Sequence, residues 1–303
     1  MEPHHGRRHD GAGAAGGRDP VHAALVREGA HREREVSVPS RYVAHRGGAA
    51  QWPENSLTAF RNAIAGGAQI LECDVHLTAD GEVAVMHDPT LDRTSSGTGP
   101  LARCTLADLR RARLRGPGGA LTEDCVPTLG EVLALAAPAV LALLVEIKTP
   151  GPAVRYERRG DRFVPVPGAR YEGLERKILE LLREAGIAER TFLLAFNPAV
   201  LAEVRALSPK QPLALLVDRH HVEEAGAPAV ETVTWAREAG ANFLGVHYTL
   251  CDAAVAEAAH AAGIALGVFT VNDEATMRRL AGWGVDVIIS DRADLVARLQ
   301  AEA

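Results

Sequence analysis

From residue 42 onward, two patterns of apolar positions alternate along the chain. Short runs rich in Val, Ile, Leu and Ala are typical of buried strands, and they predict strands over residues 42–45, 69–75, 82–87, 141–147, 191–196, 212–217, 242–247, 264–271 and 285–289. Between them, apolar residues recur every three to four positions, and this spacing predicts helices over residues 55–66, 128–137, 171–185, 198–206, 229–239, 252–262, 273–281 and 291–300.

The residues that flank these helices agree with the assignment. Asn55 and Asn197 precede helices as predicted N-caps, because an Asn side chain accepts hydrogen bonds from the first free backbone N–H groups. Glycines stand where four of the helices should end, at positions 66, 186, 240 and 263.

Repeated strand–helix units predict a parallel sheet with helices packed on it. With this many units in one chain, we predict a closed (β/α)8 TIM-type barrel in preference to an open doubly wound sheet. The open alternative would be supported by a G-x-G-x-x-G or P-loop motif, and the sequence contains neither.

Nine predicted strands compete for the eight places of the barrel. Residues 69–77 and 82–87 are joined by a short turn that contains Asp80-Gly81, which is too short for a parallel crossover and typical of a hairpin. Antiparallel pairing about this turn would bring residue 87 near residue 72, to within a residue or two. His87 would then lie at the same end of the barrel as Glu72.

Two insertions interrupt the alternation and are predicted to lie at the catalytic face of the barrel, where such loops vary. Residues 89–127 read as a loop-rich excursion with a short helix near residues 106–112. Residues 149–170 are polar, and residues 155–163 within them predict a small solvent-facing hairpin. Neither insertion is expected to need a core of its own.

Composition sets the class of protein. The chain has 303 residues, 47% of them hydrophobic, which is enough for a sizeable core. A net charge of −6 argues against a general nucleic-acid-binding surface. No apolar run reaches 18 residues, so stable membrane insertion is not expected. The four cysteines lack C-x-x-C spacing and are expected to be free thiols. The oligomeric state is left open.

The beginning of the chain differs from the rest. Residues 1–38 are rich in Gly, Ala, His and Arg and have almost no periodic apolar positions, which predicts a disordered extension before a barrel domain over residues 39–303. No continuous apolar stretch precedes a cleavage site, so we expect no secretory signal peptide and a cytoplasmic protein.

Ionisable residues end four of the predicted strands. Glu72 and Asp74 lie two positions apart in an apolar run, so their side chains share one face of the strand and would repel each other without a cation between them. Glu146, also within an apolar strand, needs a partner and is the natural third ligand. Ligands that offer only oxygen favour Mg²⁺ or Ca²⁺ over zinc.

Histidines and cations stand at the same strand ends. His45 and His87 each end a strand, and paired histidines suit proton transfer at neutral pH. Arg46 and Lys148 suit phosphate, and Glu54 is free to reach inward. Carboxylates for a cation, cations for phosphate and histidines for protons together predict a metal-assisted phosphodiesterase.

The spaced set of motifs resembles the glycerophosphodiester phosphodiesterase family. The matching residues, which extend over positions 42 to about 298 in the expected order, are His45-Arg-Gly47, Pro53-Glu-Asn55, Glu72-x-Asp74, His87-Asp88, Glu146-Ile-Lys148, Phe269-Thr-Val-Asn272 and Gly284-Val-Asp-x-Ile-Ile-Ser-Asp291. The resemblance implies a (β/α)8 barrel and a small-molecule substrate, a glycerophosphodiester, hydrolysed to sn-glycerol 3-phosphate and an alcohol.

The resemblance also implies roles for individual residues. One divalent cation, Mg²⁺ or Ca²⁺, would be held by Glu72, Asp74 and Glu146. The catalytic residues would be His45 as general base and His87 as general acid, and the substrate-binding residues would be Arg46, Lys148, Glu54, Phe269 and Asn272. The family usually has Trp where this chain has Phe269, which keeps an apolar wall for the glycerol but removes an indole N–H donor.

Several alternatives remain open at this point. The attacking group is either the glycerol 2-hydroxyl, which would give a cyclic phosphate, or water. A lysophospholipase D-like or phosphoinositide phospholipase C-like activity would share the barrel and the two histidines. A non-catalytic glycerophosphodiester-binding protein is disfavoured, because binding alone needs no acid–base pair. We expect the alcohol end to point outward, towards the loops after Asp88 and Lys148, with broad tolerance for the head group.

Overall fold

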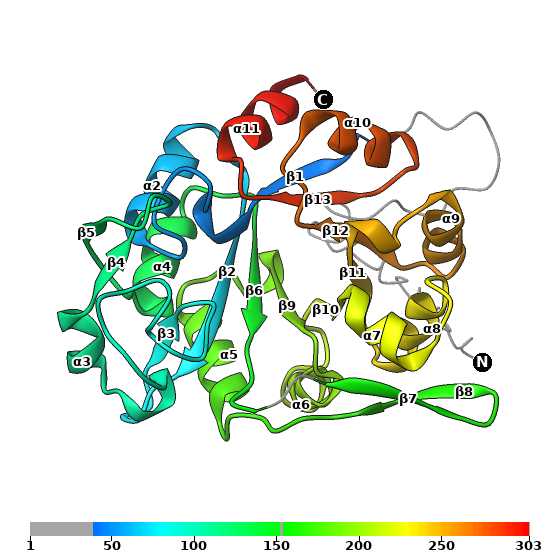
Figure 1. The fold of residues 1–303 in the computed structure, drawn as a ribbon, viewed down its shortest axis with the longest axis horizontal. Coiled ribbons are helices and arrows are strands. Elements are labelled where there is room, and N and C mark those ends of the chain that lie inside the picture. Colours follow the sequence, from blue (N-terminus) through cyan, green and yellow to red (C-terminus); the bar gives the residue numbers. More distant parts are fainter. Residues whose placement is uncertain (1–38, 152–153, 303) are drawn as a thin grey trace, which may run out of the picture.

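Eight parallel strands close into a barrel in the computed structural model, which describes residues 39–151 and 154–302 (Figure 1). The strands are β1 (Arg41–Ala44), β2 (Ile70–Leu77), β6 (Ala142–Ile147), β9 (Thr191–Ala195), β10 (Leu213–Val217), β11 (Phe243–His247), β12 (Ala265–Phe269) and β13 (Val287–Ser290). They pair in this order around the barrel, and β13 pairs with β1 to complete it. The predicted (β/α)8 architecture is confirmed.

All eight predicted helices are present, and they surround the strands (Figure 1). They are α2 (Leu57–Ala65), α4 (Leu129–Ala136), α5 (Leu174–Glu184), α6 (Pro198–Leu207), α8 (Glu231–Glu238), α9 (Ala253–Ala261), α10 (Glu274–Gly282) and α11 (Ala293–Glu302). The sequence did not predict α7 (Arg219–Ala225), which follows β10 directly, because this short helix has too few apolar residues to show a period.

One of the two predicted N-caps is wrong. Asn197 caps α6 as expected and accepts a hydrogen bond from the Ala199 N–H at 3.0 Å. At the start of α2, however, the cap is Ser56. Asn55 stands one residue earlier with a φ of 59°, and its Nδ2 donates to Asp74 Oδ2 at 2.8 Å. A buried carboxylate distant in sequence therefore takes the side chain that the local pattern assigned to the helix.

The ninth predicted strand forms the expected hairpin. β3 (Val83–Val85) runs antiparallel to β2, with Val75 opposite Val85, and the Met86 N–H donates to the Asp74 carbonyl at 2.9 Å. Continuing this register places residue 87 opposite residue 73, one position from the prediction. The hairpin thus carries His87 to the end of the barrel where Glu72 lies.

Two apolar layers fill the barrel and its surroundings. The inner layer consists of Val43, Ile70, Ala142, Leu144, Phe192, Leu194, Ala214, Leu216, Phe243, Ala265, Val287 and Ile289. Alternate residues, Cys73 among them, point outward into the larger layer between the strands and the helices. Because side chains fill the interior, functional groups must stand at the strand ends above it.

The 89–127 excursion takes part in a small apolar cluster separate from the two barrel layers, a cluster that the sequence did not predict. The excursion contains η2 (Leu101–Arg103), α3 (Leu106–Arg111), β4 (Arg113–Arg115) and β5 (Leu121–Cys125), of which only the helix was predicted. The cluster consists of Ala84, Met86, Leu91, Leu101, Leu109, Leu114 and Val126. Ala84 lies in β3 and Met86 directly follows it, so the β2–β3 hairpin completes a cluster that the excursion alone could not form.

The predicted hairpin of the second insertion is present as β7 (Arg155–Arg159) and β8 (Arg162–Val166). It is solvent-facing on one side only. On the other side Tyr156, 3% exposed, stacks on Trp235 of α8 with ring centroids 3.7 Å apart. The hairpin therefore lies along one edge of the barrel, beside α7 and α8 (Figure 1).

Short 3₁₀ turns η1 (His45–Gly47), η3 (Ala188–Arg190) and η4 (Tyr248–Leu250) complete the described elements. All four cysteines are free thiols, as predicted. Within residues 39–151 and 154–302, no helix is long and apolar enough to cross a membrane. The predicted extension over residues 1–38 lies outside the described residues.

Candidate active site

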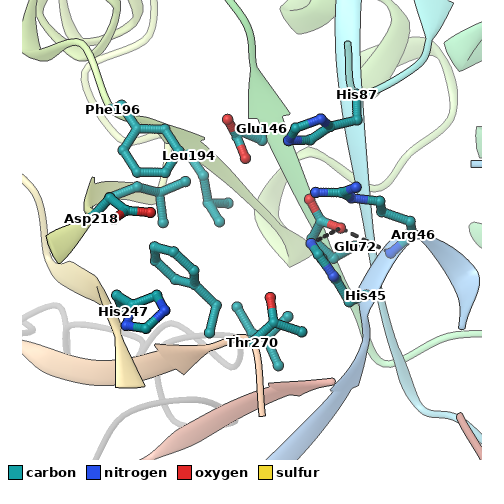
Figure 2. A pocket seen from close by; sticks show the side chains of 13 residues that line it. His45, Arg46, Glu72, His87, Glu146, Leu194, Phe196, Asp218, His247 and Thr270 are labelled. Atoms are coloured by element: carbon teal, nitrogen blue, oxygen red, sulfur yellow. Dashed lines mark hydrogen bonds and ion pairs between the residues drawn. The ribbon is translucent and has the colours of Figure 1, made fainter. Parts of the chain in front are cut away.

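A cavity of about 270 Å³ opens at the carboxyl ends of the barrel strands (Figure 2). It is lined by His45, Arg46, Glu72, His87, Glu146, Leu194, Phe196, Leu216, Asp218, His247, Phe269, Thr270 and Ile289. Every barrel strand contributes to this wall, directly or through the residues that follow it. The apolar members are the upper end of the inner core, so the cavity has an apolar floor and polar walls.

Three buried carboxylates meet at one side of this cavity. Glu72 and Asp74 project from the same face of β2, and β6 pairs with β2 so that Glu146 lies beside Asp74. The oxygen atoms that these residues offer all lie within 4.8 Å of one another. The three side chains that the sequence predicted to meet, from two different strands, therefore lie together in the structure.

Two partly buried cations compensate these carboxylates in part. Lys148 Nζ lies 2.9 Å from Asp74 Oδ1 and also contacts Glu146, while Arg46 Nε lies 3.2 Å from Asp74 Oδ2. Burial alone would raise the pKa of Asp74, but Lys148 and Arg46 hold it well below its ordinary value. Burial and the charge of Asp74 raise the pKa of Glu72 well above its ordinary value. With all three carboxylates ionised, the group would carry one more negative charge than Lys148 and Arg46 compensate.

The same group fits a divalent cation. Its ligand atoms are all carboxylate oxygens, the donor set that Mg²⁺ and Ca²⁺ prefer. Asp74 Oδ1 is fully buried and accepts no well-aligned hydrogen bond, since its contact with Lys148 is an ion pair without that geometry. A bound cation would neutralise the surplus negative charge of the group and would give Asp74 Oδ1 a partner.

His45 is held by a carboxylate on the other side of the first strand. Its Nδ1 lies 2.6 Å from Asp291 Oδ1, and Asn272 Nδ2 donates to Asp291 Oδ2 at 2.8 Å. Because a carboxylate only accepts, the proton of the neutral ring lies on Nδ1 and Nε2 is left as a base. His45 Nε2 lies 3.8 Å from Glu72 Oε2, which places the free nitrogen beside the carboxylates.

His87 has an equivalent arrangement. Its Nδ1 lies 2.7 Å from Asp88 Oδ1, and Arg93 donates to both oxygens of Asp88, at 2.7 and 2.8 Å. The hydrogen bonds from Arg93 and His87 lower the pKa of Asp88 strongly, so this carboxylate stays ionised. Both histidines therefore have one ring nitrogen fixed and the other available for proton transfer.

Arg93 connects Asp88, which holds His87, with Glu54, which contacts Arg46. Besides Asp88, its guanidinium donates to both oxygens of Glu54, at 2.9 and 2.8 Å. Glu54 in turn accepts a hydrogen bond from Arg46 Nη1 at 3.0 Å. The chain of contacts runs from Arg46 through Glu54 and Arg93 to Asp88 and so fixes the phosphate-binding candidate relative to His87.

Comparison with known proteins now places the chain in a family. Residues 45–295 match the model of the Glycerophosphoryl diester phosphodiesterase family. The chain belongs to this family. The resemblance found in the motifs is thereby confirmed, and with it the assignment to the phosphoric diester hydrolases.

Individual relatives agree over nearly their whole length. A glycerophosphodiester phosphodiesterase from Caldanaerobacter subterraneus subsp. tengcongensis is 29% identical, covering 85% of this chain and 96% of the relative. One from Bacillus altitudinis is 30% identical, covering 86% and 97%. An Oleispira antarctica phosphodiesterase, solved with its product sn-glycerol-3-phosphate, superposes with a TM-score of 0.70 at 24% identity, covering 88% of this chain and 98% of that one, and so shares the fold.

The residues that the family resemblance singled out fall into two groups in the structure. His45, Arg46, Glu72, His87, Glu146 and Phe269 line the cavity. The others lie behind them, in contact with lining groups. Lys148 and the buried Asp74 belong to the carboxylate group, Glu54 contacts Arg46, and Asn272 contacts the partner of His45.

Several site residues were missed by the sequence reasoning. Asp291 and Asp88 stand within quoted motifs, but no role was assigned to them, and Arg93 was not singled out. Asp218 and His247 were overlooked as well, although each is an ionisable residue at the end of a predicted strand. An ionisable residue at the end of an apolar run identified the four charged strand ends before residue 149, and the same pattern identifies these two residues.

Proposed function

We propose that this member of the family hydrolyses glycerophosphodiesters to sn-glycerol 3-phosphate and an alcohol with the help of one divalent cation, Mg²⁺ or Ca²⁺. The observation that carries the proposal is the placement of two carboxylate-held histidines on either side of three converging carboxylates in one cavity. A binding site alone would need no such pair of proton carriers.

Binding of the phosphate is assigned to Arg46 and Lys148. Arg46 lines the cavity, and its backbone is fixed by an N–H that donates to Glu72 Oε2 at 3.0 Å. Lys148 adds a second positive charge directly behind the carboxylates. A divalent cation held by Glu72, Asp74 and Glu146 would supply electrostatic stabilisation for the charge that develops on the phosphate. With that cation present, Arg46 and Lys148 are less occupied by the carboxylates and better able to attract a phosphate.

Proton transfer is assigned to the two histidines. His45 Nε2 takes the proton of the attacking oxygen while the new P–O bond forms. His87, protonated on Nε2, gives its proton to the leaving oxygen while the bond from phosphorus to the alcohol breaks. Asp291 and Asp88 stabilise the positive imidazolium form of each histidine, so His45 can hold the proton that it takes up and His87 the proton that it is about to give.

Two attackers fit these residues. Attack by the glycerol 2-hydroxyl gives a cyclic phosphate, which water then opens with the two histidines acting in reverse. Attack by water gives the products in one step. Both routes consume one water. In the cyclic route the second step reverses the two proton transfers and restores both histidines. In the direct route His45 releases its proton to solvent and His87 takes one up from solvent before the next turnover.

A metal-dependence assay with product analysis tests the proposal. The full chain, freed of metal and then given Mg²⁺ or Ca²⁺, should convert glycerophosphocholine to choline and sn-glycerol 3-phosphate, which phosphorus NMR identifies, along with any cyclic phosphate. Lysophosphatidylcholine should react much more slowly. A preference for it would indicate a lysophospholipase D-like enzyme, formation of phosphocholine would indicate cleavage on the other side of phosphorus, and binding without turnover would indicate a binding protein.

A further inference from the structure

The cavity has two chemically different sides (Figure 2). His45, Arg46, Glu72, His87 and Glu146 gather on one side, and the proposed mechanism uses all of them. On the other side, the carboxylate of Asp218 points toward the middle of the cavity with His247 below it, and no step of the mechanism uses either residue.

The order of strands places this second side directly across the barrel. β10, which ends just before Asp218, is four strands away from β1 in both directions around the closed sheet, and β1 ends just before His45. His247 ends β11, which is likewise opposite β2 with its two carboxylates. A substrate whose phosphate binds beside β1 and β2 would therefore reach Asp218 and His247 with its far end.

Asp218 offers an ionised hydrogen-bond acceptor. It is the N-cap of α7, and its Oδ1 lies 3.4 Å from His220 Nδ1. No lysine or arginine of the described residues forms an ion pair with it. Burial would raise the pKa of Asp218, but the hydrogen bond from His220 and the nearby imidazoles lower it. Its charge thus stands at the cavity without a strong partner.

His247 offers a donor next to this acceptor. Its Nδ1 accepts from the Thr249 N–H at 3.3 Å and lies 2.8 Å from the Thr249 hydroxyl. Because a backbone N–H can only donate, the proton of the neutral ring lies on Nε2. The Phe269 ring lies edge-on to both His247 and Phe196, with centroids 6.3 and 5.9 Å away, and adds an apolar surface beside the pair.

We propose that Asp218 and His247 are specificity-determining residues that bind the terminal hydroxyl of the glycerol end of the substrate. Asp218 accepts the hydrogen of this hydroxyl, His247 donates to its oxygen, and Phe269 covers the carbon chain. The inference rests on the proposed function and adds the residues that recognise glycerol. The glycerol 2-hydroxyl, next to the phosphate, stays on the charged side.

The pair suits a hydroxyl better than a cationic head group. A hydroxyl both donates and accepts, and so satisfies Asp218 and His247 together. A primary ammonium only donates, and the quaternary ammonium of choline neither donates nor accepts, so either would leave the imidazole N–H without an acceptor. In addition, the leaving alcohol must contact His87, whose side chain is 34% exposed on the opposite side beside the excursion. The head group therefore leads away from Asp218.

Paired substrates and variants test this assignment. The analogue is the choline phosphodiester of 1,2-propanediol esterified at its primary oxygen, which keeps the hydroxyl next to the phosphate and lacks the terminal one. Wild type should use it with kcat/KM about 10- to 100-fold lower than glycerophosphocholine, the usual loss for a hydrogen bond to a charged group. Asp218→Asn and His247→Leu should lower kcat/KM for glycerophosphocholine by a similar factor but change that for the analogue less than about 3-fold.

The controls separate recognition from folding. Asn caps helices as well as Asp does, so Asp218→Asn should keep α7 intact. Asp252→Asn makes the same change at the N-cap of α9, away from the cavity. This variant should leave the ratio of the two substrates unchanged.

Binding of sn-glycerol 3-phosphate, measured by calorimetry, gives a readout without turnover. Its Kd should rise about 10- to 100-fold in Asp218→Asn. Equal losses on both substrates, a loss that follows the charge of the head group, or an unchanged Kd would overturn the assignment. Wild type that binds sn-glycerol 3-phosphate through Asp218 but hydrolyses no glycerophosphodiester would instead refute the proposed function and leave the assignment standing.

Discussion

Glu72→Gln should abolish turnover and leave the metal-free protein at least as stable as the wild type. The amide oxygen of Gln still accepts the hydrogen bond from the Arg46 N–H, and the surplus negative charge of the buried group disappears. A neutral amide is a poor ligand for a hard cation, so electrostatic help to the transition state is lost. We expect kcat/KM to fall by about 10³-fold or more. Steady-state kinetics and melting curves with and without Mg²⁺ or Ca²⁺ measure both effects.

Chelation and a matched substitution complete this experiment. EDTA should abolish wild-type activity, and the metal should restore it. Added metal should raise the melting temperature of wild type but not that of Glu72→Gln, since binding to the folded state stabilises it. Glu157→Gln makes the same change on the exposed β7–β8 hairpin and should behave as wild type. Full activity in thoroughly metal-free protein would refute metal dependence.

His45→Ala and His87→Ala should each lower kcat by about 10²-fold or more, the usual contribution of a general acid or base. If the two residues act in one step, the double variant should lose less than the product of the two factors. The folded proteins should keep their affinity for sn-glycerol 3-phosphate to within a few fold, because the phosphate is assigned to Arg46 and Lys148. Near-normal kcat in both single variants would make these residues structural.

A change of leaving group distinguishes the roles of the two histidines. The glycerophosphodiester of 4-nitrophenol releases a stable phenolate that needs no proton, so it should restore much of the rate to His87→Ala and little to His45→Ala. Restoration of His45→Ala instead would reverse the assignment of acid and base. His260→Ala is the matched control, because His260 Nε2 lies 2.9 Å from Asp286 Oδ2 in a similar pair outside the cavity. Its kcat should not change.

The sequence predicted the barrel well because each buried strand is a local signal. An apolar run that ends in Glu72 or Glu146 is visible without knowledge of its neighbours, and parallel pairing then brings such ends together. The register of the β2–β3 hairpin could be predicted to within one residue because the short connection between Leu77 and Val83 fixes it. The core of the 89–127 excursion could not be predicted, because its apolar residues follow no period and need β3 to complete the cluster.

What the sequence did not predict depends on partners distant along the chain. Asp291 contacts His45 across 246 positions, and no local pattern connects the two. Asn55 has the composition of an N-cap, but contact with Asp74 outweighs that preference. Arg93 could not be assigned from sequence spacing, because its role is to bind two carboxylates, Glu54 and Asp88, that lie apart in the sequence. Long-range electrostatics thus decides these positions.

The guanidinium of Arg93 connects the excursion to His87, the proposed acid catalyst, through Asp88. A head group that pushes the excursion aside would pull on Arg93, and through Asp88 it would turn the imidazole of His87 away from the leaving oxygen. Small misalignments of a proton donor slow the chemical step more than they weaken binding. Diesters with poorly fitting alcohols should therefore differ from good substrates in kcat rather than in KM. A diester with a bulky head group would bind well and turn over slowly, and so would inhibit the hydrolysis of diesters with smaller head groups.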